Sequence, residues 1–174
     1  MFRRNLILIN GIVLLFGSSL FAQTAEYIGV MKCKMCHNKE TTGDQYKKWT
    51  ESAHSNAWKN LAGAKALEVG KSLNIANPQT TPKCLKCHSI AASLDKSLIA
   101  SITVEEGVSC EACHGPGSNY KSMALMKNRP DAIKAGLIIP NEKTCVKCHN
   151  PESPTYKPFN YATSEAKIAH KIPK

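Results

Sequence analysis

The sequence predicts a mainly α-helical fold with extensive loops, in which short helices wrap around a core that is not made of protein alone. Apolar side chains recur at helical spacing over residues 44–62. Only 6% of the 174 residues are aromatic, so the chain has little material of its own for a core. One short cysteine motif occurs four times at uneven intervals, which excludes a simple tandem repeat.

The repeated motif is Cys-x-x-Cys-His, and its four copies contain all eight cysteines. Two thiols with this spacing can add to the two vinyl groups of one haem, and the histidine that follows can ligate its iron. The motifs therefore predict four covalently bound c-type haems (haem c, iron) and a multihaem cytochrome c fold around a four-haem core. The predicted haem-binding residues are Cys33, Cys36 and His37; Cys84, Cys87 and His88; Cys110, Cys113 and His114; and Cys145, Cys148 and His149.

Such motifs have two other uses in proteins. A pair of zinc sites, each with four cysteines from two motifs, is the main alternative. It leaves unexplained why a histidine follows the second cysteine in every copy. A thioredoxin-like redox motif uses one Cys-x-x-Cys and needs no histidine. Covalent haem is therefore the preferred interpretation.

Residues 1–22 are predicted to be a secretory signal peptide. Arg3 and Arg4 give it a positive start, and residues 6–16 form an apolar run that small residues follow. An uncleaved membrane anchor is the alternative, although the run is short for a span of about 20 residues. Because c-type haem is attached outside the cytoplasm, we expect residues 23–174 to form one periplasmic tetrahaem domain, in contact with a membrane only if the signal is uncleaved.

The chain is basic, with a formal net charge of +10 that falls to +8 once the leader is removed. Haem propionates would lower this charge further, by about 1 for each ferric haem. A nucleic-acid partner is therefore not expected. Lysines that keep a propionate-rich surface soluble are one explanation of the excess, and a docking face for an acidic redox partner is the other.

The longest helix is predicted over residues 44–62, with Asp44 as its N-cap. Its apolar stripe consists of Tyr46, Trp49, Ala53, Ala57 and Leu61. His54 lies on the flank of this stripe, one turn before Trp58. An ordinary structural histidine is the alternative, but each of the irons needs a second axial ligand, so His54 is a candidate ligand.

The remaining segments follow from turn residues and helix caps. Gly115-Pro116-Gly117 is expected to end the turn of the third motif at once. In chain order, the sequence predicts helices at 64–75 and 90–100, a turn or extended piece at 102–107, short helices at 118–128 and 130–135, a helix on the fourth motif capped by Asn141, an extended stretch at 151–158, and a last helix at 163–172.

Histidine is in short supply for ligating the irons. Of the six histidines, four belong to the motifs, so only His54 and His170 remain as distal ligands. At most two haems can then have two histidine ligands. Met123 and Met126, on the short helix after the third motif, are candidates for another iron. The alternative for both methionines is packing against haem.

Three blocks of the sequence resemble the tetrahaem cytochrome c-554 family. They are the first motif with residues 48–57 (Lys-Trp-Thr-Glu-Ser-Ala-His-Ser-Asn-Ala), residues 107–117 around the third motif, and the C-terminal Tyr156-Lys157-Pro158-Phe159 with His170. The resemblance implies that His54 and His170 are distal haem ligands. It also implies that the second haem, on His88, is five-coordinate.

The chain departs from that family just after the third motif. The resemblance implies a histidine there as the distal ligand of the first haem, whereas residues 118–126 contain none. Met123 or Met126 is the natural substitute.

These features predict a periplasmic electron carrier that passes single electrons between a redox donor and an acceptor, with no catalytic side chain. An enzyme is the alternative, in which an open haem at His88 binds or reduces a small nitrogen or oxygen species. A structural subunit of a haem-conducting filament is a third possibility.

Overall fold

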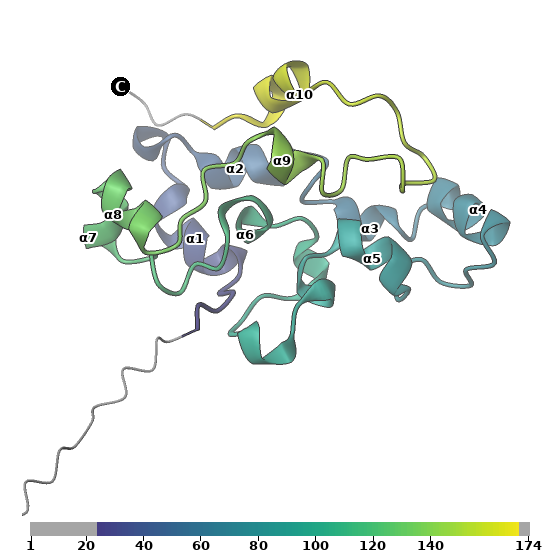
Figure 1. The fold of residues 1–174 in the computed structure, drawn as a ribbon, viewed down its shortest axis with the longest axis horizontal. Helices are drawn as coiled ribbons and strands as arrows, with labels where there is room; N and C mark the ends of the chain where they lie inside the picture. The colour runs from purple at the N-terminus through teal and green to yellow at the C-terminus, as the bar shows by residue number, and fades with distance from the viewer. Residues whose placement is uncertain (1–23, 171–174) are drawn as a thin grey trace, which may run out of the picture.

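The computed structural model describes residues 24–170, so the predicted signal peptide lies outside the described residues (Figure 1). The α-helices are α1 (Val30–His37), α2 (Gln45–Thr50), α3 (Ala57–Asn60), α4 (Ala64–Ser72), α5 (Pro82–His88), α6 (Cys110–His114), α7 (Met123–Met126), α8 (Arg129–Lys134), α9 (Glu142–Cys145) and α10 (Tyr161–Ile168). The 3₁₀ turns are η1 (Glu40–Thr42), η2 (Ala91–Ser93), η3 (Lys96–Leu98) and η4 (Val104–Glu106). Residues 24–170 contain no named strand, and one parallel bridge joins Tyr27 to Ile99. The mainly helical prediction is therefore confirmed.

Helices that are distant in sequence pack together around the centre of the molecule. α6 contacts α1, and α3 contacts α5 and η4. Figure 1 shows α7 and α8 side by side at one end, where they contact each other, and α4 at the opposite end. Within residues 24–170, no helix has the length and apolar character needed to cross a membrane.

The single helix predicted over 44–62 is wrong, because the chain turns between α2 and α3. The hydroxyl of Ser52 donates to the carbonyl of Trp49, and that of Ser55 donates to the carbonyls of Thr50 and Ser52. Such local bonds compete with the helical ladder. Asp44 precedes α2 in a left-handed conformation (φ 46°) and its side chain makes no capping bond.

The other segments also form shorter helices than predicted. α4 ends at Ser72, and Asn74 is left-handed with φ 55°. Residues 90–100 contain the turns η2 and η3, residues 118–128 contain only α7, and η4 occupies half of residues 102–107. α8 matches the helix predicted at 130–135 within one residue. The last helix is α10, which ends before His170 and starts where the side chain of Asn160 accepts from the Thr163 N–H.

A buried carboxylate joins the segment directly before α1 to the third motif. Glu111 is 2% exposed. Its Oε1 accepts from the N–H groups of Ile28 (2.9 Å) and Gly117 (2.7 Å), and its Oε2 accepts from that of Gly29 (2.8 Å). Glu106 accepts from the next amide, that of Val30, at 2.8 Å. These bonds hold the N-terminus of α1 against α6.

At Gly107, the segment that leads into the third motif passes close to His54, just before α3. Gly107 has φ +64°, and a Cβ at this position would lie 3.0 Å from the carbonyl oxygen of His54. The same carbonyl accepts from the N–H of Val108 at 3.2 Å. Glycine is required here both for its backbone conformation and for this close approach.

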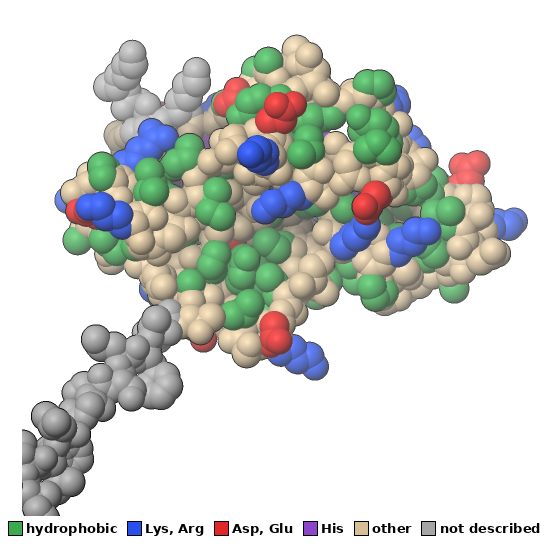
Figure 2. Space-filling view, viewed as in Figure 1, with side chains coloured by type: hydrophobic (Ala, Val, Ile, Leu, Met, Phe, Trp, Pro, Cys, Tyr) green, Lys and Arg blue, Asp and Glu red, His purple; other side chains and the backbone are tan. Residues whose placement is uncertain are grey.

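The protein's own apolar core is small. The buried apolar residues are Ile28, Val30, Ala57, Leu61, Leu85, Ala91, Ile102, Tyr120 and Ala132. A comparable set of large apolar side chains is exposed: Met31, Met35, Leu67, Met123, Ile133, Ile138, Ile139, Val146 and Tyr156. The space-filling view shows apolar patches spread over the surface between lysines (Figure 2). This balance matches the prediction that the polypeptide alone makes a thin core.

We predict that Glu111→Ala strongly destabilises the fold. The substitution leaves three amide N–H groups without their acceptor, and each unsatisfied buried group costs about 1–3 kcal/mol. The free energy of unfolding, measured by denaturant titration of the isolated protein, should fall by roughly 3 kcal/mol or more. Glu105→Ala is the control, because Glu105 is exposed; equal stability of the two variants would contradict the role of Glu111.

Candidate haem sites

The first three motifs lie on short helices, which gives their side chains a common direction. α1, α5 and α6 contain the motifs that end in His37, His88 and His114. Residues three and four apart share one face of a helix, so both cysteines and the histidine of a motif face the same side. Proline at the first turn favours the start of α5, and Gly115 ends α6 with φ 77°, as predicted.

The fourth motif begins on a helix and continues in turns. α9 starts after Asn141, as predicted, and the Asn141 N–H donates to the hydroxyl of Thr144 at 3.3 Å. The helix ends at Cys145, so Cys148 and His149 lie in the turn that follows. The N–H groups of both residues donate back to the carbonyl of Cys145, at 3.2 Å and 3.0 Å.

Thiols from different motifs lie close together. A hydrogen bond between the Cys33 and Cys110 thiols raises the pKa of Cys33. Burial and the neighbouring charge of Cys145 raise the pKa of Cys113 to about 11. The first motif is therefore next to the third, and the third next to the fourth.

The second motif lies next to the fourth. Burial, together with the charge and the hydrogen bond of Cys87, raises the pKa of Cys148 to about 12. The four motifs thus form one connected row in the order first, third, fourth, second. This order differs from their order along the sequence.

The two distal histidine candidates each face a motif histidine. The ring centres of His54 and His149 are 6.0 Å apart, with 70° between the ring planes. Those of His114 and His170 are 5.9 Å apart, with 65° between the planes. Because a metal–imidazole bond is about 2 Å long, two imidazoles on opposite sides of one metal ion have ring centres about 6 Å apart. Both pairs therefore have the separation that a bis-histidine haem requires.

Several histidines are held by the nitrogen that would not bind iron. Nδ1 of His88 lies 2.8 Å from the carbonyl oxygen of Ala57, and Nδ1 of His114 lies 3.0 Å from that of Ile138. Nδ1 of His170 lies 3.1 Å from the carbonyl of Ile168. A carbonyl only accepts, so Nδ1 carries the proton in each case and Nε2 keeps a free lone pair for a metal.

The environments of His54 and His114 favour neutral imidazole, the form that ligates metals. Burial lowers the pKa of His54, and the neighbouring His149 lowers it further. Burial also lowers the pKa of His114, and His170 and His37 add to that effect, while the Ile138 carbonyl opposes it.

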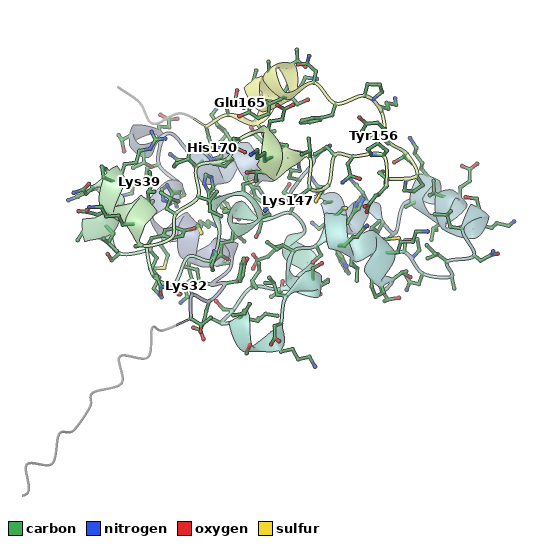
Figure 3. The ribbon with its side chains drawn as sticks, viewed as in Figure 1. Lys32, Lys39, Lys147, Tyr156, Glu165 and His170 are labelled. Atoms are coloured by element: carbon green, nitrogen blue, oxygen red, sulfur yellow. The ribbon has the colours of Figure 1, made fainter. Side chains whose placement is uncertain are left out.

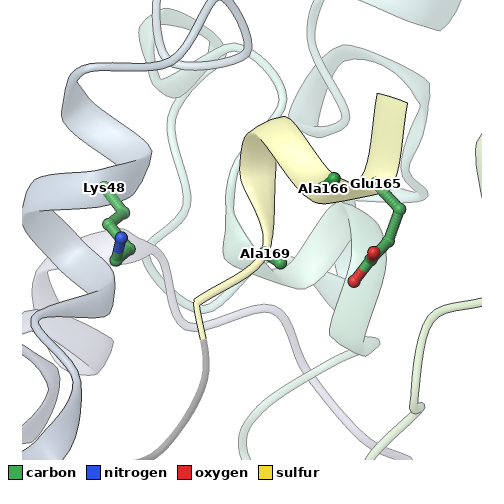
Figure 4. Close-up of a pocket in the computed structure, with 4 residues that line it drawn as sticks. All are labelled: Lys48, Glu165, Ala166 and Ala169. Carbon is green, nitrogen blue, oxygen red and sulfur yellow. The ribbon is translucent and has the colours of Figure 1, made fainter. Parts of the chain in front are cut away.

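The C-terminal segment contacts His149 and contains His170. The Phe159 ring stacks on the His149 ring, with centres 4.9 Å apart and 22° between the planes. A hollow of about 410 Å³ lies between α2 and α10 and is lined by Lys48, Glu165, Ala166 and Ala169 (Figure 4). Ala169 directly precedes His170, so the hollow adjoins the segment that carries this histidine.

His37 and His88 have no histidine partner. The two histidines outside the motifs are already opposite His149 and His114. Nδ1 of His37 instead lies 3.3 Å from the side-chain oxygen of Gln45. Met123 is 65% exposed on α7, and Met126 is partly buried there. Ligation by either methionine stays a prediction.

The arrangement required by the zinc alternative does not occur. Within residues 24–170, no three side chains of His, Cys, Asp or Glu converge in a way that could hold a metal ion. All eight cysteines are free thiols. Exposed apolar side chains inside or beside the motifs, such as Met35 and Val146, would instead suit an apolar macrocycle. The residues present therefore fit haem.

Sequence reasoning missed the groups that orient the motif histidines. The acceptors for His88 and His114 are main-chain carbonyls, which carry no residue-specific signal. Gln45 was not singled out either, although its position eight residues after His37 is readable in the sequence. Only the tertiary structure shows that these groups lie beside the imidazoles.

Comparison with known proteins finds cytochrome c-554 among those that the chain resembles. The family model described as "Cytochrome c554 and c-prime" matches residues 32–115, a range that includes the first three motifs. A cytochrome c-554 of Nitrosomonas europaea is 30% identical over 149 residues, which cover 76% of this chain and 61% of that protein. The chain thus spans about three-fifths of that relative's length. No solved structure matches the chain. The family model and this relative both support the cytochrome c-554 family as the family of this chain.

Proposed function

We propose that this protein is a periplasmic tetrahaem c-type cytochrome that passes single electrons between redox partners. The cytochrome c-554 family suggests an electron-transfer cytochrome with covalently bound c-type haem. Beyond what the family suggests, we propose that the protein has four haems, that particular histidines ligate them, and that it is periplasmic. The observation that carries it is the connected row of four motifs, in which two motif histidines face a second imidazole about 6 Å away.

In this proposal, the cysteines and the histidine have the same roles in every motif. The two cysteines hold the haem through thioether bonds, and the motif histidine is the proximal ligand. His54 and His149 would together ligate one haem iron, and His170 and His114 would together ligate another. The carbonyls bonded to Nδ1 fix the orientation and the tautomer of the proximal rings.

The row of motifs supplies a path through the protein. Haem iron contributes a one-electron ferric–ferrous couple when it is bound. In the polypeptide Cys33 lies near Cys110 and Cys87 lies near Cys148, so the chain brings neighbouring motifs, and the haems that they would hold, close together. Electrons would therefore enter or leave at the first and second motifs, which lie at the two ends of the row.

Lysines near the motifs support docking of redox proteins with acidic faces. Lys34, Lys86 and Lys147 each occupy a position between the two cysteines of a motif. Figure 3 labels Lys147 of the fourth motif and Tyr156, which lies on the loop after that motif. Lys86 forms an ion pair with Glu152, and the ammonium of Lys34 lies over the Tyr46 ring. The exposed Lys147 is therefore the most available of the three to a partner. A basic surface of this kind would steer acidic donors and acceptors towards the haems.

A second candidate function rests on His88. Because no histidine remains to face it, the haem on His88 could bind a small nitrogen or oxygen species at an open position. The same holds for His37 if neither Met123 nor Met126 ligates its iron. Binding or reduction of such a ligand would make the protein a haem enzyme rather than a carrier alone.

We predict that the isolated protein contains four haems and that each motif holds one. Replacing both Cys84 and Cys87 by Ser should lower the haem content from four to three, because no thioether can then form at the second motif. Intact-protein mass spectrometry under denaturing conditions measures this count. A wild-type protein with fewer than four covalent haems would contradict the proposal.

We predict that His54→Ala converts one low-spin ferric haem to high-spin, because the iron held by His149 loses its second imidazole. Electron paramagnetic resonance of the oxidised protein measures the change. His170→Ala should do the same for the haem held by His114. The double variant should therefore lose two low-spin haems. Unchanged spectra for either single variant would refute that ligand assignment.

We predict that nitric oxide binds the ferrous wild-type protein at the haem on His88. Optical titration should show one fast-binding haem, and the variant without the Cys84 and Cys87 thiols should lack it. If all four haems are low-spin and nitric oxide binds to none, the enzyme candidate is eliminated and the electron carrier remains.

A further inference from the structure

Trp58 contains a buried polar group that no protein atom satisfies. Its indole Nε1 is shielded from solvent and has no hydrogen-bond partner within residues 24–170. An indole N–H can only donate a hydrogen bond. A buried donor without an acceptor is unfavourable, so an unpaired one calls for a partner outside the polypeptide.

The other tryptophan shows that this is specific to Trp58. The sequence has two tryptophans. Nε1 of Trp49 donates to the carbonyl oxygen of Val108 at 2.9 Å, so the chain itself satisfies that indole. The two residues lie on consecutive helices, α2 and α3, and provide a natural comparison.

Trp58 lies beside the second motif. Its neighbour Ala57 supplies the carbonyl that accepts from Nδ1 of His88 at 2.8 Å. The carbonyl of Trp58 itself accepts from the side chain of Gln79, 3.3 Å away, just before α5. The helix of Trp58, α3, packs against α5, which carries the second motif. The backbone of Trp58 is thus tied to the segment that holds His88.

We propose that the indole N–H of Trp58 donates a hydrogen bond to a propionate carboxylate of the haem held by Cys84, Cys87 and His88. This inference rests on the proposed function, because it requires that haem. Propionate oxygens are the strong acceptors on the edge of a haem, and a carboxylate in a partly buried site needs donors of this kind. Trp58 is then a positioning residue that fixes the haem edge.

The hydrogen bond also affects the redox equilibrium of that haem. A donor to the propionate withdraws negative charge from the neighbourhood of the iron. This makes the ferrous state less unfavourable, so the midpoint potential of the haem is higher with the bond than without it. Trp58→Phe keeps an aromatic ring at the position and removes only the donor.

The test uses the haem-loaded protein and two variants, Trp58→Phe and Trp49→Phe. Intact mass first establishes that each sample contains four haems. In Trp49→Phe the remaining tryptophan is Trp58, so ultraviolet resonance Raman reads the hydrogen-bonding state of its indole directly. Visible resonance Raman of Trp58→Phe reads the propionate bending bands, and spectroelectrochemistry reads the midpoint potentials.

The proposal expects a hydrogen-bonded indole in Trp49→Phe. It expects a shifted propionate band and a lowered potential of one haem in Trp58→Phe, with neither change in Trp49→Phe. A non-hydrogen-bonded indole, or unchanged propionate bands in Trp58→Phe, would overturn it while leaving the tetrahaem assignment intact. If Trp58→Phe fails to load haem, the indole band of Trp49→Phe decides alone. A wild type without haem at the second motif would instead refute the proposed function and this inference with it.

Discussion

The buried carboxylate of Glu111 is the interaction on which the rest of this structure depends. It lies within the third motif and accepts three main-chain N–H groups, two of them from the segment that leads into the first motif. A single side chain thereby joins two motifs that are far apart in sequence. It also fixes the turn at Gly117, just beyond the third motif. With so small an apolar core, the chain relies on such polar connections to place its motifs.

Main-chain contacts position the histidines of the site in a similar way. Main-chain carbonyls of Ala57 and Ile138 orient the rings of His88 and His114, and Gly107 allows the segment of His54 to approach the third motif. Short helices suit this task because each needs to present one motif only. The exposed apolar side chains that remain are the surface a macrocycle would cover.

The proposed carrier and enzyme functions differ at a small number of positions. His54 and His170 are placed opposite His149 and His114, which favours low-spin haems suited to electron transfer. His37 and His88 lack such partners. Whether the haems that they would hold have a second iron ligand therefore decides between the two functions. Trp58, next in sequence to the residue that binds Nδ1 of His88, has a buried indole N–H without an acceptor among residues 24–170, and our proposal assigns this donor to the edge of the haem on His88.

The sequence by itself determined the cofactor chemistry, because the Cys-x-x-Cys-His spacing is a local property, and it determined the mainly helical class. It also singled out His54 and His170 by counting, since iron ligands must come from few residue types. The tertiary structure alone decided where helices stop, since the serine side chains between α2 and α3 compete with the helical ladder. It alone decided which histidines pair and the order of the motifs in the row. Pairings of this kind depend on contacts between distant segments, and no local pattern encodes them.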